Sequence, residues 1–317
     1  MFYDGGTMQL HFVFINPATH RLRSGWRVTI YFAVLALPNL ILSALFKASP
    51  SASAATISNN FDVSWAMVAV YVVMNVWVAF VSIAAFRWLD GASWRAWGYL
   101  LHQGWSRDLF MGLLIGLLMI ATVVGLQVLG SGTRLHVADG SSWRGIIVAS
   151  LLLWLAAAFE ELLFRGYAFQ TLLRDVPAWV PVIGLNLFFG LAHWMNPSRT
   201  TFSTINTVLA GAWLALAVMR TRSLWLATGL HFSWNWTMGV LFGLPVSGMR
   251  LPNTFLFASS EAPMWLTGGS YGSEGGVTAM LAFSLAALWI WRTAKLRVAP
   301  QTELALSDQS QTLQQAS

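Results

Sequence analysis

The sequence predicts an all-α, polytopic membrane protein, a bundle of about eight transmembrane helices. Composition is the first observation: 56% of the residues are hydrophobic and only 9% are charged, whereas soluble domains are about a quarter charged. The second is that apolar stretches of about 20 residues, the length that crosses a bilayer, recur along the chain. Cysteine is absent, which excludes disulfides, iron–sulfur clusters and thiolate chemistry.

The apolar stretches are taken as membrane spans in chain order. Residues 1–25 lack the short apolar core and small-residue cleavage site of a signal peptide, so we interpret them as a cytoplasmic or interfacial arm. We expect small, polar residues 49–60 to form an outer loop and Gly-, Pro- and Ser-containing residues 243–276 to form the longest one. The predicted spans are residues 28–46, 63–86, 109–129, 145–167, 180–194, 202–219, 224–242 and 277–291.

The positive charges predict the orientation. With the N-terminus inside, thirteen of the eighteen Lys and Arg residues lie in inner segments, so the positive-inside rule places both termini in the cytoplasm. The net charge of +6 is spread between apolar runs and forms no patch, which argues against a nucleic-acid partner. We expect a multi-pass protein of the cell (plasma) membrane, with the lipid bilayer as its surroundings. The outer basic residues would be Lys47, Arg134, Arg144, Arg199 and Arg250.

Two adjacent acids follow a long uncharged run. Glu160 and Glu161 follow residues 145–159, none of which is charged, and acids inside a membrane are expensive and usually functional. Glu161 and Arg165 are four residues apart and share one helix face, whereas Glu160 points about 100° away. The spacing predicts that Arg165 holds Glu161 and that Glu160 is left as a candidate general base.

Three more polar residues lie inside predicted spans. His193 follows Phe189 by one turn, and His231 precedes Asn235 by one turn. Counted from the inner span ends at about 1.5 Å per residue, Glu160 lies about 10 Å deep, His231 about 11 Å, Asn235 about 17 Å and His193 about 20 Å. His193 reaches the level of the others if the fifth span begins later than residue 180. The other histidines, His11, His20, His102 and His136, fall in aqueous or interfacial segments.

These residues resemble three motifs of a known family. Glu160-Glu161-x-x-x-Arg165, Phe189-x-x-x-His193 and His231-x-x-x-Asn235 are similar to those of the CPBP intramembrane proteases. That family is also called the CAAX protease and bacteriocin-processing (Abi) family, and it includes the type II CAAX prenyl endopeptidases. The resemblance covers residues 143–242, which we take as the catalytic core. Residues 1–142 would then be the N-terminal arm and first three spans, and residues 243–317 the outer loop, last span and a disordered cytoplasmic tail.

The resemblance implies a role for each motif residue. Glu160 would activate the attacking water together with His193, and His231 with Asn235 would stabilise the oxyanion, with Glu161 and Arg165 in support. We expect the four catalytic side chains to line one water-filled pocket opening toward the cytoplasmic half of the bilayer, with Glu160 and His193 about 3 to 6 Å apart. The substrate would be a peptide or membrane protein.

Two questions stay open at the level of sequence. Glu160, His193 and His231 are a plausible zinc set, yet there is no His-Glu-x-x-His helix, so zinc-dependent hydrolysis and metal-free, glutamate-activated hydrolysis are equally expected. The alternatives to an intramembrane peptidase are a non-catalytic peptide-binding or immunity scaffold and a small-solute transporter. A transporter would show inverted repeats or matched broken helices, and we find neither.

Overall fold

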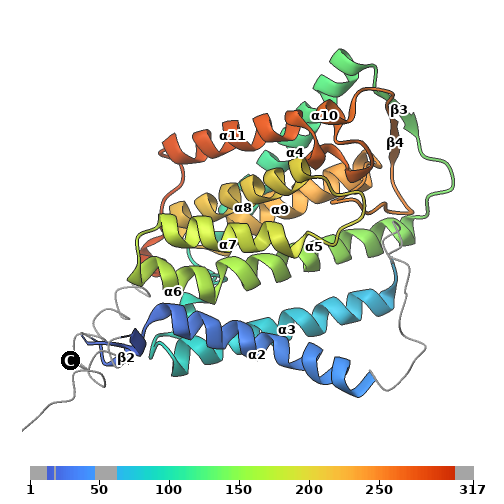
Figure 1. Cartoon of the computed structure of the whole chain (residues 1–317). Coiled ribbons are helices and arrows are strands. Elements are labelled where there is room, and N and C mark those ends of the chain that lie inside the picture. Colours follow the sequence, from blue (N-terminus) through green and yellow to red (C-terminus); the bar gives the residue numbers. More distant parts are fainter. Residues whose placement is uncertain (1–12, 18, 47–62, 304–317) are drawn as a thin grey trace, which may run out of the picture.

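The computed structural model describes residues 13–17, 19–46 and 63–303, and within them the chain is a bundle of long helices (Figure 1). The predicted loop at 49–60, His11, Lys47, most of the N-terminal arm and the tail from residue 304 lie outside the described residues. Four short strands accompany the helices: β1 (Ile15–Asn16) pairs with β2 (Arg21–Leu22), and β3 (Arg134–Val137) with β4 (Leu256–Ser259). The expectation of an all-α membrane bundle is confirmed.

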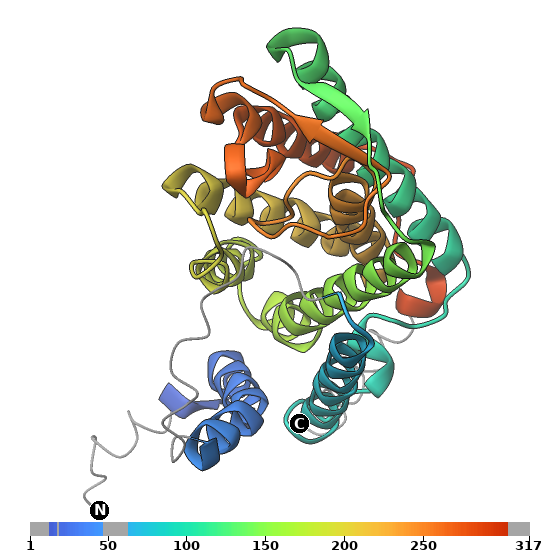
Figure 2. The same ribbon diagram turned by 90° about the vertical axis from the view of Figure 1, so that its right-hand side faces the viewer.

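Two helices form an outer layer of the bundle. α2 (Ser24–Phe46) and α3 (Trp65–Trp88) pack against each other and lie beside α5 and α6 (Figure 2). The side chain of Ser64 accepts a hydrogen bond from the Met67 amide and so caps the start of α3. A 3₁₀ turn, η2 (Trp94–Trp97), then leads to α4 (Trp105–Ser131).

The closest helix crossing joins α4 to α9 (Leu224–Trp236). A Cβ at Gly112 would collide with the Leu226 carbonyl oxygen, and one at Gly229 would lie 2.6 Å from the Leu109 carbonyl oxygen. Gly116 faces the Leu230 carbonyl in the same way. Small residues let membrane helices approach closely, so these glycines fix how deeply α9 sits in the bundle.

The central layer carries the first motif. α5 (Trp143–Arg165) begins at the cap Ser142, whose hydroxyl accepts from the Gly145 amide, and breaks at Gly166 before α6 (Tyr167–Asp175). The chain then returns as α7 (Trp179–Ala192), which ends at His193. The helical path thus continues past residue 167, where the sequence placed the inner end of the fourth span.

The remaining helices close the bundle. α8 (Thr201–Thr221) starts with a capping box between Thr200 and Ser203 and packs on α7, α9 and α11 (Val277–Arg292). α9 continues as a π-helical turn, η3 (Thr237–Leu241). Short elements α10 (Met264–Thr267), η4 (Gly269–Tyr271) and η5 (Ser273–Gly275) precede α11.

Helix lengths agree with a membrane protein. A helix lies at each of the eight predicted spans, and four described helical segments are long and apolar enough to cross a bilayer: 65–88, 105–130, 143–175 and 201–221. α7 and α11 are apolar but shorter. α9 extends its own length through η3.

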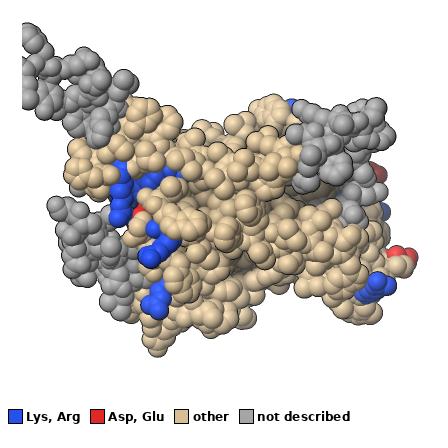
Figure 3. Space-filling model, turned by 90° about the horizontal axis from the view of Figure 1, so that it is seen from below, with Lys and Arg blue, Asp and Glu red and all other residues tan. Residues whose placement is uncertain are grey.

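One end of the bundle gathers the segments predicted to be cytoplasmic. The start of α2, the ends of α3 and α8 and the α6–α7 turn lie at the left of Figure 1. Blue Lys and Arg side chains cluster at that end in Figure 3. The ion pairs Arg27–Asp90, Arg27–Asp175 and Arg174–Asp90 join α2, the end of α3 and α6 there.

Residues 243–276 fold back over the other end of the bundle. β4 in this segment pairs with β3, the Gly248 amide donates to the Tyr271 carbonyl at 2.9 Å, and Asn206 of α8 donates to the Glu274 carbonyl at 2.7 Å. The Gly248 φ of +88° favours glycine. This segment therefore forms part of the packed structure around the helix ends.

Candidate active site

Glu160 and Glu161 enter different surroundings because consecutive helical residues diverge by about 100°. The Glu161 side chain is fully buried, whereas that of Glu160 is 25% exposed. Glu160 lines the cavity around the motifs and Glu161 does not. Helix geometry alone therefore explains why Glu160 faces the cavity and Glu161 faces the protein interior.

Glu161 is held by two cationic or hydrogen-bonding partners. Its Oε1 lies 3.4 Å from Arg165 Nη1 and accepts a hydrogen bond from His231 Nδ1 at 2.9 Å. The contact with Arg165 confirms the spacing argument. The contact with His231, which comes from a different helix, was not foreseen.

Arg165 joins three helices. Its Nη2 donates to Asn186 Oδ1 on α7 and to the Gly211 carbonyl on α8, both at 3.1 Å, and its Cζ lies 4.5 Å from the centre of the Phe189 ring. A Cβ at Gly211 would lie 3.0 Å from Arg165 Nη2 and 2.7 Å from Asn186 Oδ1. Because Gly211 has no side chain, the Arg165 guanidinium has room to lie beside it.

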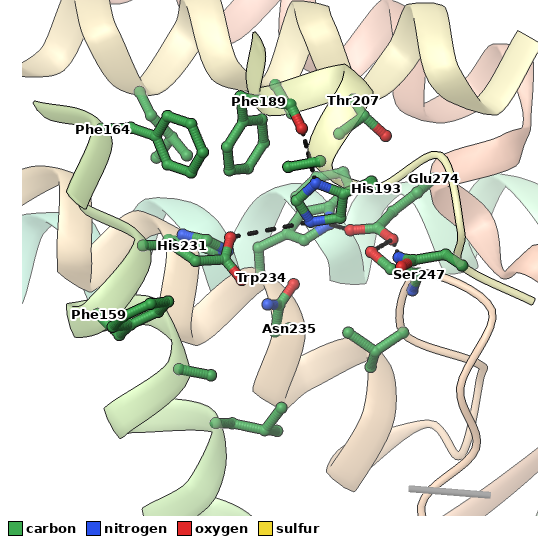
Figure 4. Close-up of a pocket in the computed structure, with 18 of the residues that line it drawn as sticks. Phe159, Phe164, Phe189, His193, Thr207, His231, Trp234, Asn235, Ser247 and Glu274 are labelled. Carbon is green, nitrogen blue, oxygen red and sulfur yellow. Dashed lines mark hydrogen bonds and ion pairs between the residues drawn. The ribbon is translucent and has the colours of Figure 1, made fainter. Parts of the chain in front are cut away.

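The two histidines converge on one oxygen. His193 Nε2 and His231 Nε2 each lie 3.8 Å from Glu160 Oε2, within the 3 to 6 Å range expected for Glu160 and His193. Figure 4 shows the two rings on opposite sides of the pocket. His193 Nδ1 donates to the Phe189 carbonyl at 2.8 Å, which fixes the ring that ends α7.

The hydrogen bonds of His193 and His231 determine what can bind between their Nε2 atoms and Glu160 Oε2. A carbonyl and a carboxylate only accept, so Nδ1 carries the proton on both rings, and Nε2 of each neutral ring is an acceptor. Glu160 Oε2 is buried and has no hydrogen-bond partner among the described residues. When both rings are neutral, three acceptors face one point, and a water molecule, which offers two protons, can bridge atoms 3.8 Å apart.

Asn235 lines the same pocket, one turn of α9 beyond His231. Figure 4 shows its side chain directed into the space below the two histidines. The structure thus brings Glu160, His193, His231 and Asn235 to one cavity.

The cavity has a volume of about 310 Å³ and mainly aromatic and aliphatic walls. Its polar lining also includes residues that the sequence did not single out: Tyr71, Asn196, Asn206, Thr207, Ser247 and Glu274. Val246, Ser247, Met249 and Glu274 belong to residues 243–276. The cavity therefore reaches the end of the bundle that the predicted topology places outside, which differs from the expected opening toward the cytoplasmic half.

The path through α6 explains how His193 reaches Glu160. Glu160 lies 15 residues before the end of α6 at Asp175, and His193 lies 14 residues after the start of α7 at Trp179. At about 1.5 Å per residue, both are then roughly 22 Å from the α6–α7 turn. The depth of about 10 Å for Glu160 was counted from residue 167, whereas helical structure continues to Asp175.

The residue types at this point are those that zinc prefers. Imidazole nitrogens and a carboxylate oxygen are normal zinc ligands. Within residues 13–17, 19–46 and 63–303, however, no group of three or more His, Asp or Glu side chains is placed to hold a metal ion. The arrangement present fits a bridging water.

Two supporting residues were missed at the level of sequence. Asn186 is a single polar residue in an apolar helix, seven residues before His193 and hence on nearly the same face, which was a usable signal. Glu274 lies in a Gly- and Ser-rich segment without periodicity, and no sequence pattern connects it with the motifs.

The comparison with known families agrees with this geometry. A family model described as type II CAAX prenyl endopeptidase Rce1-like matches residues 142–237. No curated protein matches the sequence. The matched segment runs from the cap of α5 to the first residue of η3 and includes all seven motif residues. The match covers less than half of the chain and supports a CAAX-type family of intramembrane proteases.

Proposed function

We propose that this protein is an intramembrane endopeptidase that hydrolyses a peptide bond of a membrane-associated protein or peptide, with Glu160 as the general base. The observation that carries the proposal is the convergence of His193 Nε2 and His231 Nε2 on Glu160 Oε2, each at 3.8 Å, inside a cavity. Peptide hydrolysis needs a base within one water of its target and donors for the developing negative oxygen.

Water activation is assigned to Glu160 and His193. A water bridging Glu160 Oε2 and His193 Nε2 donates one proton to each, which directs an oxygen lone pair toward a bound carbonyl carbon. As the C–O bond forms, Glu160 takes one proton from the water. The Phe189 carbonyl keeps the His193 ring in the orientation that accepts the other hydrogen bond.

Oxyanion stabilisation is assigned to His231 and Asn235. The Asn235 amide group donates to the tetrahedral oxygen, and His231 donates through Nε2 when that atom carries a proton. The Glu161 carboxylate on Nδ1 balances the positive charge of that imidazolium. Collapse of the intermediate breaks the C–N bond, and the proton held by Glu160 passes to the leaving nitrogen.

The proposed chemistry has no resident metal. Glu160 performs the deprotonation itself, and Glu161 is a positioning residue that acts through His231 and Arg165. Turnover is therefore expected to survive dialysis against a chelator.

The test compares cell membranes containing the intact protein with membranes containing Glu160→Gln. Mass spectrometry of protein termini should find new carboxyl termini in the first sample that are missing from the second. Glu261→Gln, the same isosteric change at an exposed carboxylate, is the matched control and should keep the wild-type termini. Chelator-treated purified protein should cleave the identified substrate as before.

Two results would contradict the proposal. Equal termini in the wild-type and Glu160→Gln samples would favour a peptide-binding scaffold. Loss of cleavage after chelation, restored by zinc, would show that a metal replaces the glutamate in activating the water.

A further inference from the structure

Glu274 places a second carboxylate in the wall of the cavity. Its Oε1 accepts from Trp234 Nε1 at 3.1 Å, and its Oε2 accepts from both the amide and the hydroxyl of Ser247 at 2.8 Å. Figure 4 shows the carboxylate directed toward the space between His193 and Ser247. Glu274 lies outside the segment 142–237 that matches the family, so the family match assigns it no role.

The charge of Glu274 has no cationic partner in the described part of the chain. None of the ion pairs among those residues includes Glu274, and its three donors are all neutral. A carboxylate offers about four acceptor positions, so one remains. No Lys or Arg lines the cavity, whereas Glu160 and Glu274 both do.

The neighbouring Tyr271 phenol is not ionised, so Glu274 carries the negative charge at this end of the cavity. Burial, with the Glu274 charge as the second cause, raises the pKa of the Tyr271 phenol to about 12, so the phenol stays neutral. The field at this end of the cavity is therefore that of an anion, which attracts cations.

The Trp234 ring beside the carboxylate belongs to a cluster of three aromatic rings. The Trp234 ring, whose nitrogen donates to Glu274, lies 4.4 Å from Phe283 and 6.1 Å from Trp213 between ring centres. All three line the cavity. Rings beside an anion form a site for a cationic side chain, because the aliphatic stem packs on the rings and the charged end pairs with the carboxylate.

We propose that Glu274 and Trp234 form a subsite that binds a Lys or Arg side chain of the substrate. The inference rests on the proposed peptidase function. Trp234 follows His231 by three residues on α9 and directly precedes Asn235. Glu274 lines the same cavity as Glu160, so the bound cation lies close to the cleaved bond.

The hydrogen bonds of Glu274 also connect Ser247 to Trp234 on α9. A purely structural role of Glu274 would change cleavage in a different way from recognition of a cation. If Glu274 only fixed the wall of the cavity, its replacement would reduce cleavage of all substrates alike. Recognition of a cation predicts a loss confined to substrates that carry one.

The experiment uses full-length protein in lipid nanodiscs and a randomised peptide library read by mass spectrometry. Wild type should select Lys or Arg at one position near the cleaved bond. Glu274→Gln should lower kcat/KM for a Lys peptide relative to its norleucine analogue by about tenfold or more, and Glu274→Lys should prefer Asp or Glu there. Glu261→Gln, in the same 243–276 segment, should retain the wild-type selectivity. An equal loss on Lys and norleucine peptides in Glu274→Gln would overturn the proposal.

A binding measurement separates this inference from the peptidase function. Glu160→Gln protein should bind the Lys peptide more tightly than the norleucine peptide, and Glu160→Gln with Glu274→Gln should bind both equally. Selective binding without any wild-type cleavage would reject the peptidase function and keep the subsite. Cleavage by the wild type without a cation preference would keep the function and reject the subsite.

Discussion

At the scale of residues, Glu160 and Glu161 are neighbours in sequence with different surroundings. Glu161 is enclosed by Arg165 and His231, whereas Glu160 is partly exposed to the cavity. Local spacing was enough to predict the Glu161–Arg165 contact, because both residues lie on one helix. It could not predict the Glu161–His231 hydrogen bond, since that depends on how α5 and α9 pack.

Neutralising Glu161 is predicted to lower stability, whereas neutralising Glu160 is predicted to abolish cleavage. Glu161→Gln leaves Arg165 buried without its charge partner, a loss of about 3–5 kcal/mol of stability, and it removes the carboxylate that orients His231. Glu160→Gln removes the proposed base at a partly exposed position and should keep the wild-type melting temperature while abolishing cleavage. Thermal unfolding in detergent, together with the peptide assay, distinguishes the two. A stable, inactive Glu161→Gln beside an active Glu160→Gln would reverse the two assignments.

At the scale of elements, apolar runs located the helices well. Sequence alone placed a span at each of eight helices, because a run of about 20 apolar residues has few alternatives to a helix. The sequence-based prediction ended the fourth span at residue 167, because polar residues follow. In the structure Tyr167 and Thr171 each donate to Asp90 at 2.9 Å, and Arg174 pairs with it. These long-range partners support α6, and they are not visible in local sequence.

The α4–α9 crossing gives a prediction at this scale. Gly112→Ala would push a methyl group into the Leu226 carbonyl and should destabilise the protein by about 1–3 kcal/mol. Gly125→Ala is the control in the same helix, because nothing lies within 4 Å of a Cβ there. It should leave the melting temperature unchanged or raise it. Equal melting temperatures for the two variants would show that the crossing tolerates a wider spacing.

At the scale of the whole molecule, the alternation of helices fits the predicted topology. Reporter fusions after Arg222 and within residues 243–276 should give opposite signals, with the first cytoplasmic, because thirteen of eighteen basic residues lie in the predicted inner segments. A fusion after Gly104 should match the one after Arg222, since both precede helices that start at the same end. Identical signals from Arg222 and residues 243–276 would exclude the arrangement of spans.

The shape of the cavity was the least predictable feature. The motif residues could be assigned to a common pocket because the three motifs fall on three separate predicted spans and together resemble those of one family. The contribution of residues 243–276 depends on contacts such as Asn206 to the Glu274 carbonyl and Gly248 to the Tyr271 carbonyl. Such contacts between residues distant in sequence have no periodic signal, so the segment was interpreted as a loop.

The division of the cavity wall between two stretches of chain has a consequence for protein engineering. The residues proposed for hydrolysis all lie in residues 142–237, whereas Ser247 and Glu274 come from the segment that follows. Chimeras that exchange residues 243–276 between homologous proteins would therefore graft a new substrate preference onto an unchanged hydrolytic centre. Substitutions confined to residues 243–276 would then alter the proposed subsite and leave the proposed hydrolytic residues unchanged.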